Sequence, residues 1–322
     1  MSQPADFSRV QQLTVNSEQS GQRLDNFLSR VLKRAPKGLI YRIIRRGEVR
    51  VNGSRAKPVT RVTTGDIIRV PPVRLGDDEP AIFSQEKVDQ LSQWVLTETD
   101  DFLAFNKPSG VAVHRGSGLN WGLIDLVRRW RPDAYLELVH RLDRQTSGCL
   151  LLARNREALA RAGKWFAGDG VGKRYLALLD GQLENEQVTS SQPLSRVSAG
   201  DGRREVRADK DGKTAVSHFT RLAQANGCTL VSVTIETGRT HQIRVHAQGL
   251  GAPVIGDDKY GKRRQNGQRG RNTNAANRTM LHCYRLDIAE AALGLCAPLP
   301  NDFSAAADRL LGDPQWREII GD

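Results

Sequence analysis

One acidic residue, Asp143, lies between two arginines in the string HRLDRQTSG (residues 140–148), which continues into an apolar run. A carboxylate in such a place can act as a general base or as a nucleophile. It can also be one half of an ion pair that holds a turn between two strands. The string alone does not decide between catalysis and structure.

Metal and nucleotide chemistry have little support in the sequence. His241 and His246 are five residues apart, so a helix would not place them on one face like the two ligands of HExxH. The four cysteines are scattered and form no CxxC pair, which argues against a zinc site and a disulfide framework. Neither a GxGxxG nor a P-loop motif is present. We therefore expect no metal and no cofactor.

A helix is expected in the string THQIRVHAQGLG (240–251), with Thr240 as its N-cap. Apolar residues at Ile243 and Ala247 would form its buried face. Arg244 would lie on another face, together with the polar residues next to it in helical spacing, His241 and Gln248. This helix therefore offers a cation to any acidic group nearby.

The elements that must position these residues alternate between strand and helix patterns from about Trp94 onward. Strands are expected in FLAFNKPSG, ELVHRLD, CLLLA, KRYLALLDG, AVSHFTRL and TLVSVTIETG. Helices are expected at 121–130 and 156–166. Several adjacent strands can pair by hairpins, so the pattern predicts an α+β domain with a mixed, largely antiparallel sheet.

Positive charge is concentrated near the N-terminus. Residues 21–75 contain fourteen basic and three acidic side chains, a net charge of +11 out of +12 for the chain. Apolar residues at helical spacing predict helices at 22–33 and 36–47, and alternating strands follow in EVRVNG and GDIIRV. Such a concentration of charge favours a module that binds nucleic-acid phosphates.

This N-terminal segment resembles the S4 RNA-binding domain in RLDNFL, in the arginine-rich second helix and in GEVRVNG. The resemblance implies a small domain of helices and strands whose arginines contact structured RNA. Arg42, Arg45, Arg46 and Arg50 are the candidate RNA-binding residues.

Four ordered strings, NKPSGVAVH, HRLDRQTSG, KRYLAL and TGRTHQIRVHAQGLG, resemble the A family of ribosomal pseudouridine synthases, which modify the large ribosomal particle. The PPVR string and the stretch RGSGLNWGLIDLVRRWRPDAYLELVHRLD are most similar to the C-type members of that family. The resemblance implies cofactor-free isomerisation of uridines in large-subunit (23S) ribosomal RNA, free or in its assembly intermediates, at the uridines that C-type members modify.

The resemblance also assigns roles to four residues. It implies that Asp143 is the catalytic carboxylate and that Arg244 pairs with it. Burial under a nucleotide disfavours an ionised carboxylate, so a nearby cation is physically required. Tyr175 would pack beside the target base, and Arg141 would occupy the space that the flipped nucleotide leaves.

The expected organisation has five parts: a disordered tail at 1–11, an S4-like domain at 12–75, a linker at 76–93, a pseudouridine synthase domain at 94–303 and a C-terminal tail at 304–322. The basic stretch 261–278 should be a mobile loop, either a second RNA contact or a solvated insertion. No secretory signal or long apolar run is present, so we expect a soluble, cytoplasmic monomer without a membrane partner.

Two other functions fit parts of the pattern. An S4 protein could bind ribosomal RNA as an assembly factor without catalysis, but the intact HRLD and KRY strings favour an enzyme. A pseudouridine synthase of the same family could also act on other ribosomal or transfer RNA uridines. A glycosidase would normally need two carboxylates, and the sequence offers one strong candidate.

Overall fold

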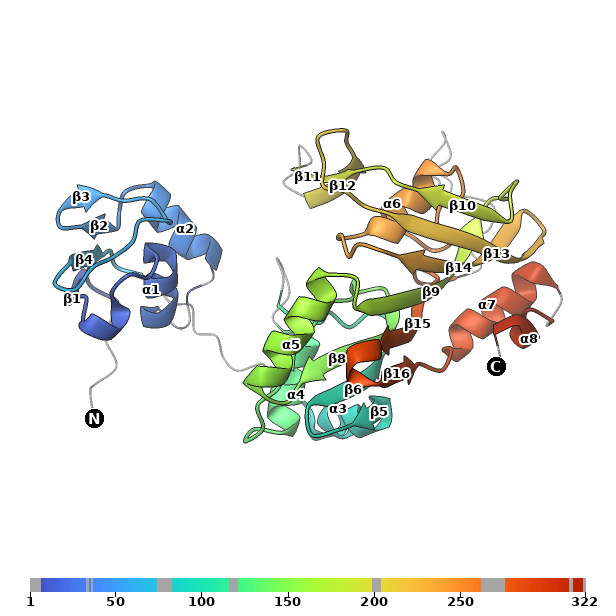
Figure 1. The fold of residues 1–322 in the computed structure, drawn as a ribbon, viewed down its shortest axis with the longest axis horizontal. Coiled ribbons are helices and arrows are strands. Elements are labelled where there is room, and N and C mark those ends of the chain that lie inside the picture. Colours follow the sequence, from blue (N-terminus) through green and yellow to red (C-terminus); the bar gives the residue numbers. More distant parts are fainter. Residues whose placement is uncertain are drawn as a thin grey trace. The chain divides into compact units, whose positions relative to one another are not determined.

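The computed structural model describes residues 7–32, 35, 37–73, 83–115, 121–198, 204–261, 276–312 and 315–320. The chain divides into two compact units between residues 82 and 83 (Figure 1). Each unit has its own cluster of buried apolar side chains. Among the described residues, no helix combines the length and hydrophobicity that a membrane span requires.

The N-terminal unit packs two helices against a small sheet. Its elements are β1 (Gln11–Thr14), η1 (Ser17–Gln19), α1 (Leu24–Val31), α2 (Lys37–Arg45), β2 (Arg50–Val51), β3 (Ser54–Arg55) and β4 (Ile67–Val70), and the sheet order is β1-β4-β2-β3. Leu24, Phe27 and Leu28 are fully buried, so the predicted apolar stripe of the first helix is confirmed. Asn52 and Gly53 both have positive φ, as the predicted tight turn requires.

The N-terminal tail predicted at 1–11 is too long. Phe7 is buried in the core of the N-terminal unit, and its carbonyl accepts a hydrogen bond of 2.8 Å from the backbone N–H of Val73. Residues 7–11 therefore belong to this unit, and residues 1–6 lie outside the described part of the chain.

The C-terminal unit is built on a ten-stranded mixed sheet. Its main path is β10-β13-β14-β9-β15-β8-β6-β5, with β16 paired to β15 and β7 to β8. The strands are β5 (Val95–Glu98), β6 (Phe102–Lys107), β7 (Glu137–Leu138), β8 (Ser147–Ala153), β9 (Val171–Asp180), β10 (Gln187–Ser190), β13 (Ser217–Ala225), β14 (Cys228–Ile235), β15 (Leu281–Ile288) and β16 (Leu293–Cys296). The β8–β15 pair is parallel and its neighbours in the path are antiparallel. The predicted α+β class with a largely antiparallel sheet is confirmed.

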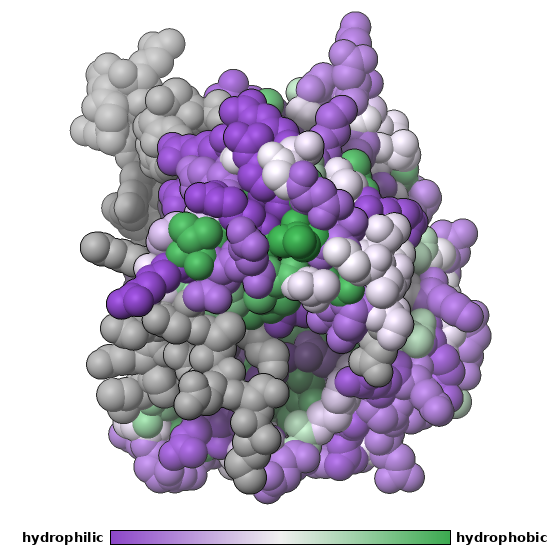
Figure 2. Space-filling view, turned by 90° about the vertical axis from the view of Figure 1, so that its left-hand side faces the viewer, coloured by the Kyte–Doolittle hydropathy of each residue, from purple (hydrophilic) through white to green (hydrophobic). Residues whose placement is uncertain are grey.

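Helices and one separate hairpin complete the C-terminal unit (Figure 1). The hairpin is β11 (Leu194–Ser198) with β12 (Arg204–Ala208). The helices are α3 (Gln85–Asp89), η2 (Gln90–Trp94), α4 (Leu123–Trp130), α5 (Arg156–Ala167), α6 (Gln242–Gly249), η4 (Ala289–Ala291), α7 (Asn301–Leu311) and α8 (Trp316–Ile320). The side of the molecule drawn in Figure 2 is mostly hydrophilic, with small hydrophobic patches.

Two predicted boundaries differ from the structure. Within the linker predicted at 76–93, the segment from Phe83 on belongs to the C-terminal unit, where Val88 and Leu91 are buried in the core. The tail predicted at 304–322 contains most of α7 and all of α8, and Trp316 is 1% exposed. Both segments are short and amphipathic, so their apolar faces become visible only once the sheet that covers them is known.

Candidate active site

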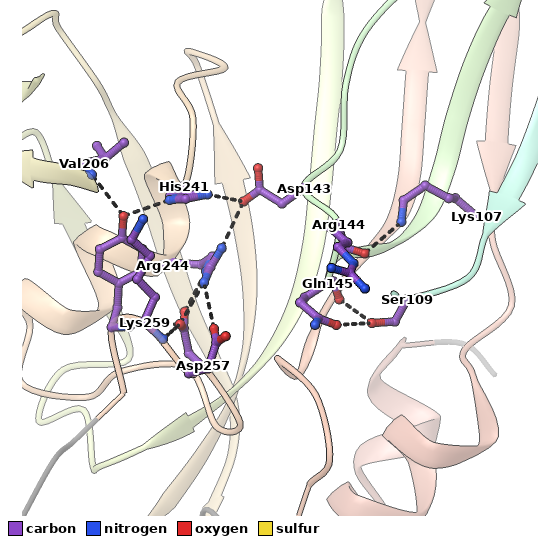
Figure 3. Close-up of polar contacts among 12 residues, drawn as sticks. Lys107, Ser109, Asp143, Arg144, Gln145, Val206, His241, Arg244, Asp257 and Lys259 are labelled. Atoms are coloured by element: carbon purple, nitrogen blue, oxygen red, sulfur yellow. Dashed lines mark hydrogen bonds and ion pairs between the residues drawn. The ribbon is translucent and has the colours of Figure 1, made fainter. Parts of the chain in front are cut away.

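Asp143 lies in the loop between β7 and β8, and a second loop fixes this loop in place. The predicted strand ELVHRLD ends at Leu138, so Asp143 is free of the sheet. Ser109 Oγ donates to the carbonyl oxygen of Gln145 at 2.7 Å, and Gly110 N–H donates to that of Arg144 at 2.8 Å (Figure 3). The NKPSG loop therefore supports the aspartate loop through backbone contacts.

Lys107 joins the same two loops from below. Its side chain is fully buried, and its Nζ donates to the carbonyl oxygens of Pro108 and Val111, both at 2.8 Å, and of Arg144 at 3.3 Å. Three acceptors match the three N–H groups of an ammonium. Burial lowers the pKa of Lys107 to about 7, and the charge of Asp143 acts in the opposite direction.

Arg244, on α6, is the cation that faces Asp143. Its Nη1 is 3.5 Å from Asp143 Oδ2, and the two side chains are 6% and 25% exposed. This distance is at the limit of a hydrogen bond, so the contact is a loose ion pair. The predicted proximity of Arg244 to Asp143 is found.

Asp257 binds Arg244 more tightly than Asp143 does. Its carboxylate accepts from Arg244 Nε at 2.6 Å and from Nη2 at 2.8 Å, in the two-pronged geometry typical of arginine and carboxylate. Its side chain is fully buried and also accepts from the backbone N–H groups of Lys259 and Tyr260, both at 2.9 Å. The sequence analysis did not identify this residue, because GDDKYG has the composition of an ordinary turn.

The pKa values of Arg244 and Asp257 show the result of this pairing. Burial acts to raise the pKa of Asp257, but the hydrogen bonds and charge of Arg244 outweigh it and lower that pKa. Burial likewise acts to lower the pKa of Arg244, and the bonds from Asp257 outweigh it. Arg244 is thus a permanently charged, fixed group with Nη1 directed at Asp143 (Figure 3).

His241 approaches the same carboxylate from the start of α6. It adopts a left-handed backbone conformation with φ of 56° and is the N-cap, so the prediction of Thr240 as N-cap was wrong. Its Nε2 is 3.9 Å from Asp143 Oδ2, and its Nδ1 is 2.8 Å from the hydroxyl of Tyr260. That hydroxyl accepts from Val206 N–H at 3.1 Å, which leaves its own proton for Nδ1 and places the imidazole proton on Nε2.

Tyr175 and Arg141 complete the pocket around Asp143. Tyr175 lies on β9 and is 7% exposed, and burial raises the pKa of its phenol. Arg141 is exposed, two residues before Asp143. Both line one pocket with Asp143 and Arg244, so the four predicted site residues of this unit are brought together.

A larger groove continues from this pocket. It has a volume of about 870 Å³ and includes Asp143, Tyr175, His140 and Lys173 in its lining. This volume lies in the upper range of ligand-binding clefts.

The predicted RNA-binding arginines lie in the N-terminal unit. Arg42 and Arg45 are exposed on α2, Arg46 is exposed directly after it, and Arg50 is partly exposed on β2. Most of the predicted loop at 261–278 lies outside the described residues. In the described part of the chain, no cluster of three or more His, Cys, Asp or Glu is arranged to hold a metal ion.

A basic S4-like module joined to a mixed-sheet domain, with one carboxylate beside a fixed arginine, defines an enzyme that acts on RNA. The chain matches the family model for RNA pseudouridylate synthase at residues 101–249 and that for the S4 domain at residues 22–68. Two curated relatives are named "Ribosomal large subunit pseudouridine synthase C". The one from Haemophilus influenzae is 45% identical over 87% of both chains. The one from Escherichia coli is 43% identical over 88% of this chain and 90% of its own.

Solved structures agree with these matches. Human RNA Pseudouridylate Synthase Domain Containing 4 is 25% identical, with a TM-score of 0.58 over 69% of this chain and 95% of its own. Human RNA Pseudouridylate Synthase Domain Containing 1 is 29% identical, with a TM-score of 0.54 over 64% and 83%. The chain belongs to the RNA pseudouridylate synthase family, and it is an RNA pseudouridine synthase with an N-terminal S4 domain.

Proposed function

We propose that this enzyme isomerises uridines of large-subunit ribosomal RNA, at the positions that its C-type relatives modify, and that Asp143 is the catalytic carboxylate. The names of the relatives support the substrate. One observation supports the residue: Asp143 is the acidic side chain that lines the pocket beside Arg244, whose charge Asp257 holds in place.

The reaction requires no group from outside the pocket. The N1–C1′ bond breaks, the uracil turns, and C5 bonds to C1′, while the C5 proton is lost and N1 gains a proton. Asp143 can add to the sugar as a nucleophile or remove a sugar proton as a base, and both routes need an ionised carboxylate. Arg244 favours that ionised state.

The other residues hold the RNA in this proposal. Tyr175 packs against the flipped uracil, and the exposed Arg141 occupies the space that the nucleotide vacates. Arg42, Arg45, Arg46 and Arg50 of the S4 domain bind phosphates, either in free ribosomal RNA or in an assembly intermediate of the large ribosomal particle.

Complementation tests this proposal. The gene is expressed in an Escherichia coli strain that lacks its synthase C, and pseudouridine is mapped chemically in the large-subunit RNA. The chain should restore the missing modifications, and Asp143→Asn should lower single-turnover rates by at least about 10⁴-fold with unchanged folding and RNA affinity. The exposed Asp133→Asn is the matched control and should keep the full rate. Restoration by Asp143→Asn would refute the catalytic assignment, and pseudouridine at other positions would refute the proposed sites.

A further inference from the structure

Two hydrogen-bond donors in the groove have no acceptor among the described residues, and neither has a role in the mechanism above. They are Lys173 Nζ and His140 Nδ1. Both residues line the groove that continues from Asp143. Phe166, on α5, contacts both of them.

Lys173 is a buried lysine that opens onto the groove. It lies two residues before Tyr175 on β9, so the two side chains are on the same face of the strand, about 7 Å apart along it. The residue is 6% exposed and its Nζ is 5.7 Å from the centre of the Phe166 ring. The described residues provide no hydrogen bond or ion pair for this ammonium, although it is not sealed from solvent. Burial lowers its pKa.

His140 is a fixed donor. Its Nε2 accepts from the backbone N–H of Leu151 at 3.0 Å, so the proton of the neutral ring must be on Nδ1. Its ring stacks on Phe166 at 4.8 Å, and burial lowers its pKa to about 3, so the ring stays neutral. Nδ1 finds no acceptor in the described part of the chain and is not among its sealed polar atoms.

We propose that Lys173 and His140 form a subsite for a backbone phosphate of the RNA next to the flipped uridine. This inference rests on the proposed function, because it takes the Asp143 pocket as the place of the flipped uridine. Both groups only donate, so their ligand must accept. A charged ligand is favoured over a base carbonyl because an unpaired buried ammonium is costly, and a phosphate supplies the missing negative charge.

The test combines an enzyme variant with a modified substrate. The RNA is a ribosomal fragment that the wild-type enzyme converts, made with a neutral methylphosphonate at each phosphate in turn around the target uridine. Single-turnover rates and half-saturation concentrations are measured for wild-type enzyme and Lys173→Met. Lys164→Met, an exposed lysine on α5, removes the same charge as a control.

Lys173→Met and one particular methylphosphonate should each lower kcat/KM by about 10- to 100-fold, and combining them should cause no further loss. Lys164→Met should add its effect independently at every phosphate. Lys173→Met should also raise the Tm, because an uncompensated buried charge is replaced by an apolar side chain of similar length. Lys173→Gln provides a second variant without the charge, expected to show the same pattern of rates.

The other outcomes separate this inference from the proposed function. Losses that multiply at every phosphate, or a Lys173→Met variant with wild-type kcat/KM, would overturn the subsite alone. A lower Tm together with lower activity would assign Lys173 to the scaffold and overturn it as well. Non-additivity with an abasic neighbour, in place of a phosphate, would identify a base carbonyl as the ligand and overturn the phosphate subsite. A wild-type enzyme that converts no ribosomal RNA would refute the proposed function and the subsite with it.

Discussion

The two units of the molecule use arginine in opposite ways. In the described part of the N-terminal unit, Arg42, Arg45 and Arg50 form no ion pair, and Arg46 has one distant partner, Glu48 at 3.8 Å. The C-terminal unit ties many of its arginines to carboxylates. Such pairs are Arg128–Glu137, Arg131–Glu98, Arg161–Asp101, Arg244–Asp257, Arg278–Asp302 and Arg285–Asp287.

This difference separates binding from support more clearly than a count of charges does. An unpaired exposed arginine can release counterions by neutralising a phosphate, whereas the charge of a paired one is already neutralised by a neighbour. The C-terminal unit therefore has many arginines and little net charge. Its exposed Arg141, which has no ion pair in the described residues, lies at the catalytic pocket.

The tightest pair offers the strongest way to break this comparison. Asp257→Asn should lower the free energy of unfolding by about 3–5 kcal/mol, because it leaves the Arg244 charge buried without its main partner. Turnover should fall with it, since a displaced Arg244 no longer faces Asp143. Urea denaturation and single-turnover assays measure the two effects.

Asp258→Asn is the matched control for this substitution. Asp258 is 77% exposed and 3.7 Å from Arg244, so its loss should change stability by less than about 1 kcal/mol. The effect of Asp257 should also depend on pH. Folding lowers the pKa of Asp257, so its stabilisation is present above the unfolded value, about 3.9, and is lost as the pH falls through the folded value. Equal effects of the two substitutions would show that the buried pair is not special.

The sequence analysis located the candidate catalytic carboxylate but not the residue that controls its partner. Asp143, Tyr175 and Arg244 lie in strings that resemble a known family, and the structure brings them into one pocket. Asp257 lies thirteen residues after Arg244, in a turn, and nothing in local composition marks a carboxylate as fully buried. Its role depends on how the chain folds back from α6, which is tertiary information.

The same reasoning explains which elements were predicted well. The helices α1 and α2 have strong apolar stripes, and periodicity alone identified them. The short α3 and the terminal α8 have five residues each, too few to show a period. They are stabilised mainly by packing on the sheet domain, so a single sequence contains little sign of them.

Removing residues 1–82 tests the division of labour between the units at an intermediate scale. The separate cores indicate that residues 83–322 will fold alone. RNA affinity should fall by at least about 10-fold near physiological salt, because the unpaired arginines are lost. The rate at saturating RNA should persist, since the pocket lies wholly outside the deletion. Salt titrations of binding and single-turnover rates provide both values.

Two results would contradict this division. An unchanged affinity would mean that the N-terminal arginines do not bind the RNA. A saturating rate that vanishes in a folded fragment would mean that the N-terminal unit helps to build the active site.

The finest test exchanges single arginines of the two kinds. Arg45→Gln removes an unpaired arginine from α2, and Arg285→Gln removes an exposed one whose Nε is 2.9 Å from Asp287. Both change the net charge equally, so a general effect of charge would act on both alike. If pairing decides, Arg45→Gln should lower the slope of log affinity against log salt by about 0.7 to 0.9, the value for one phosphate contact. Arg285→Gln should leave the slope unchanged, because its charge is already neutralised and no counterions are released there on binding. Equal slopes for both variants would show that total charge, and not the unpaired state of the arginine, controls RNA binding.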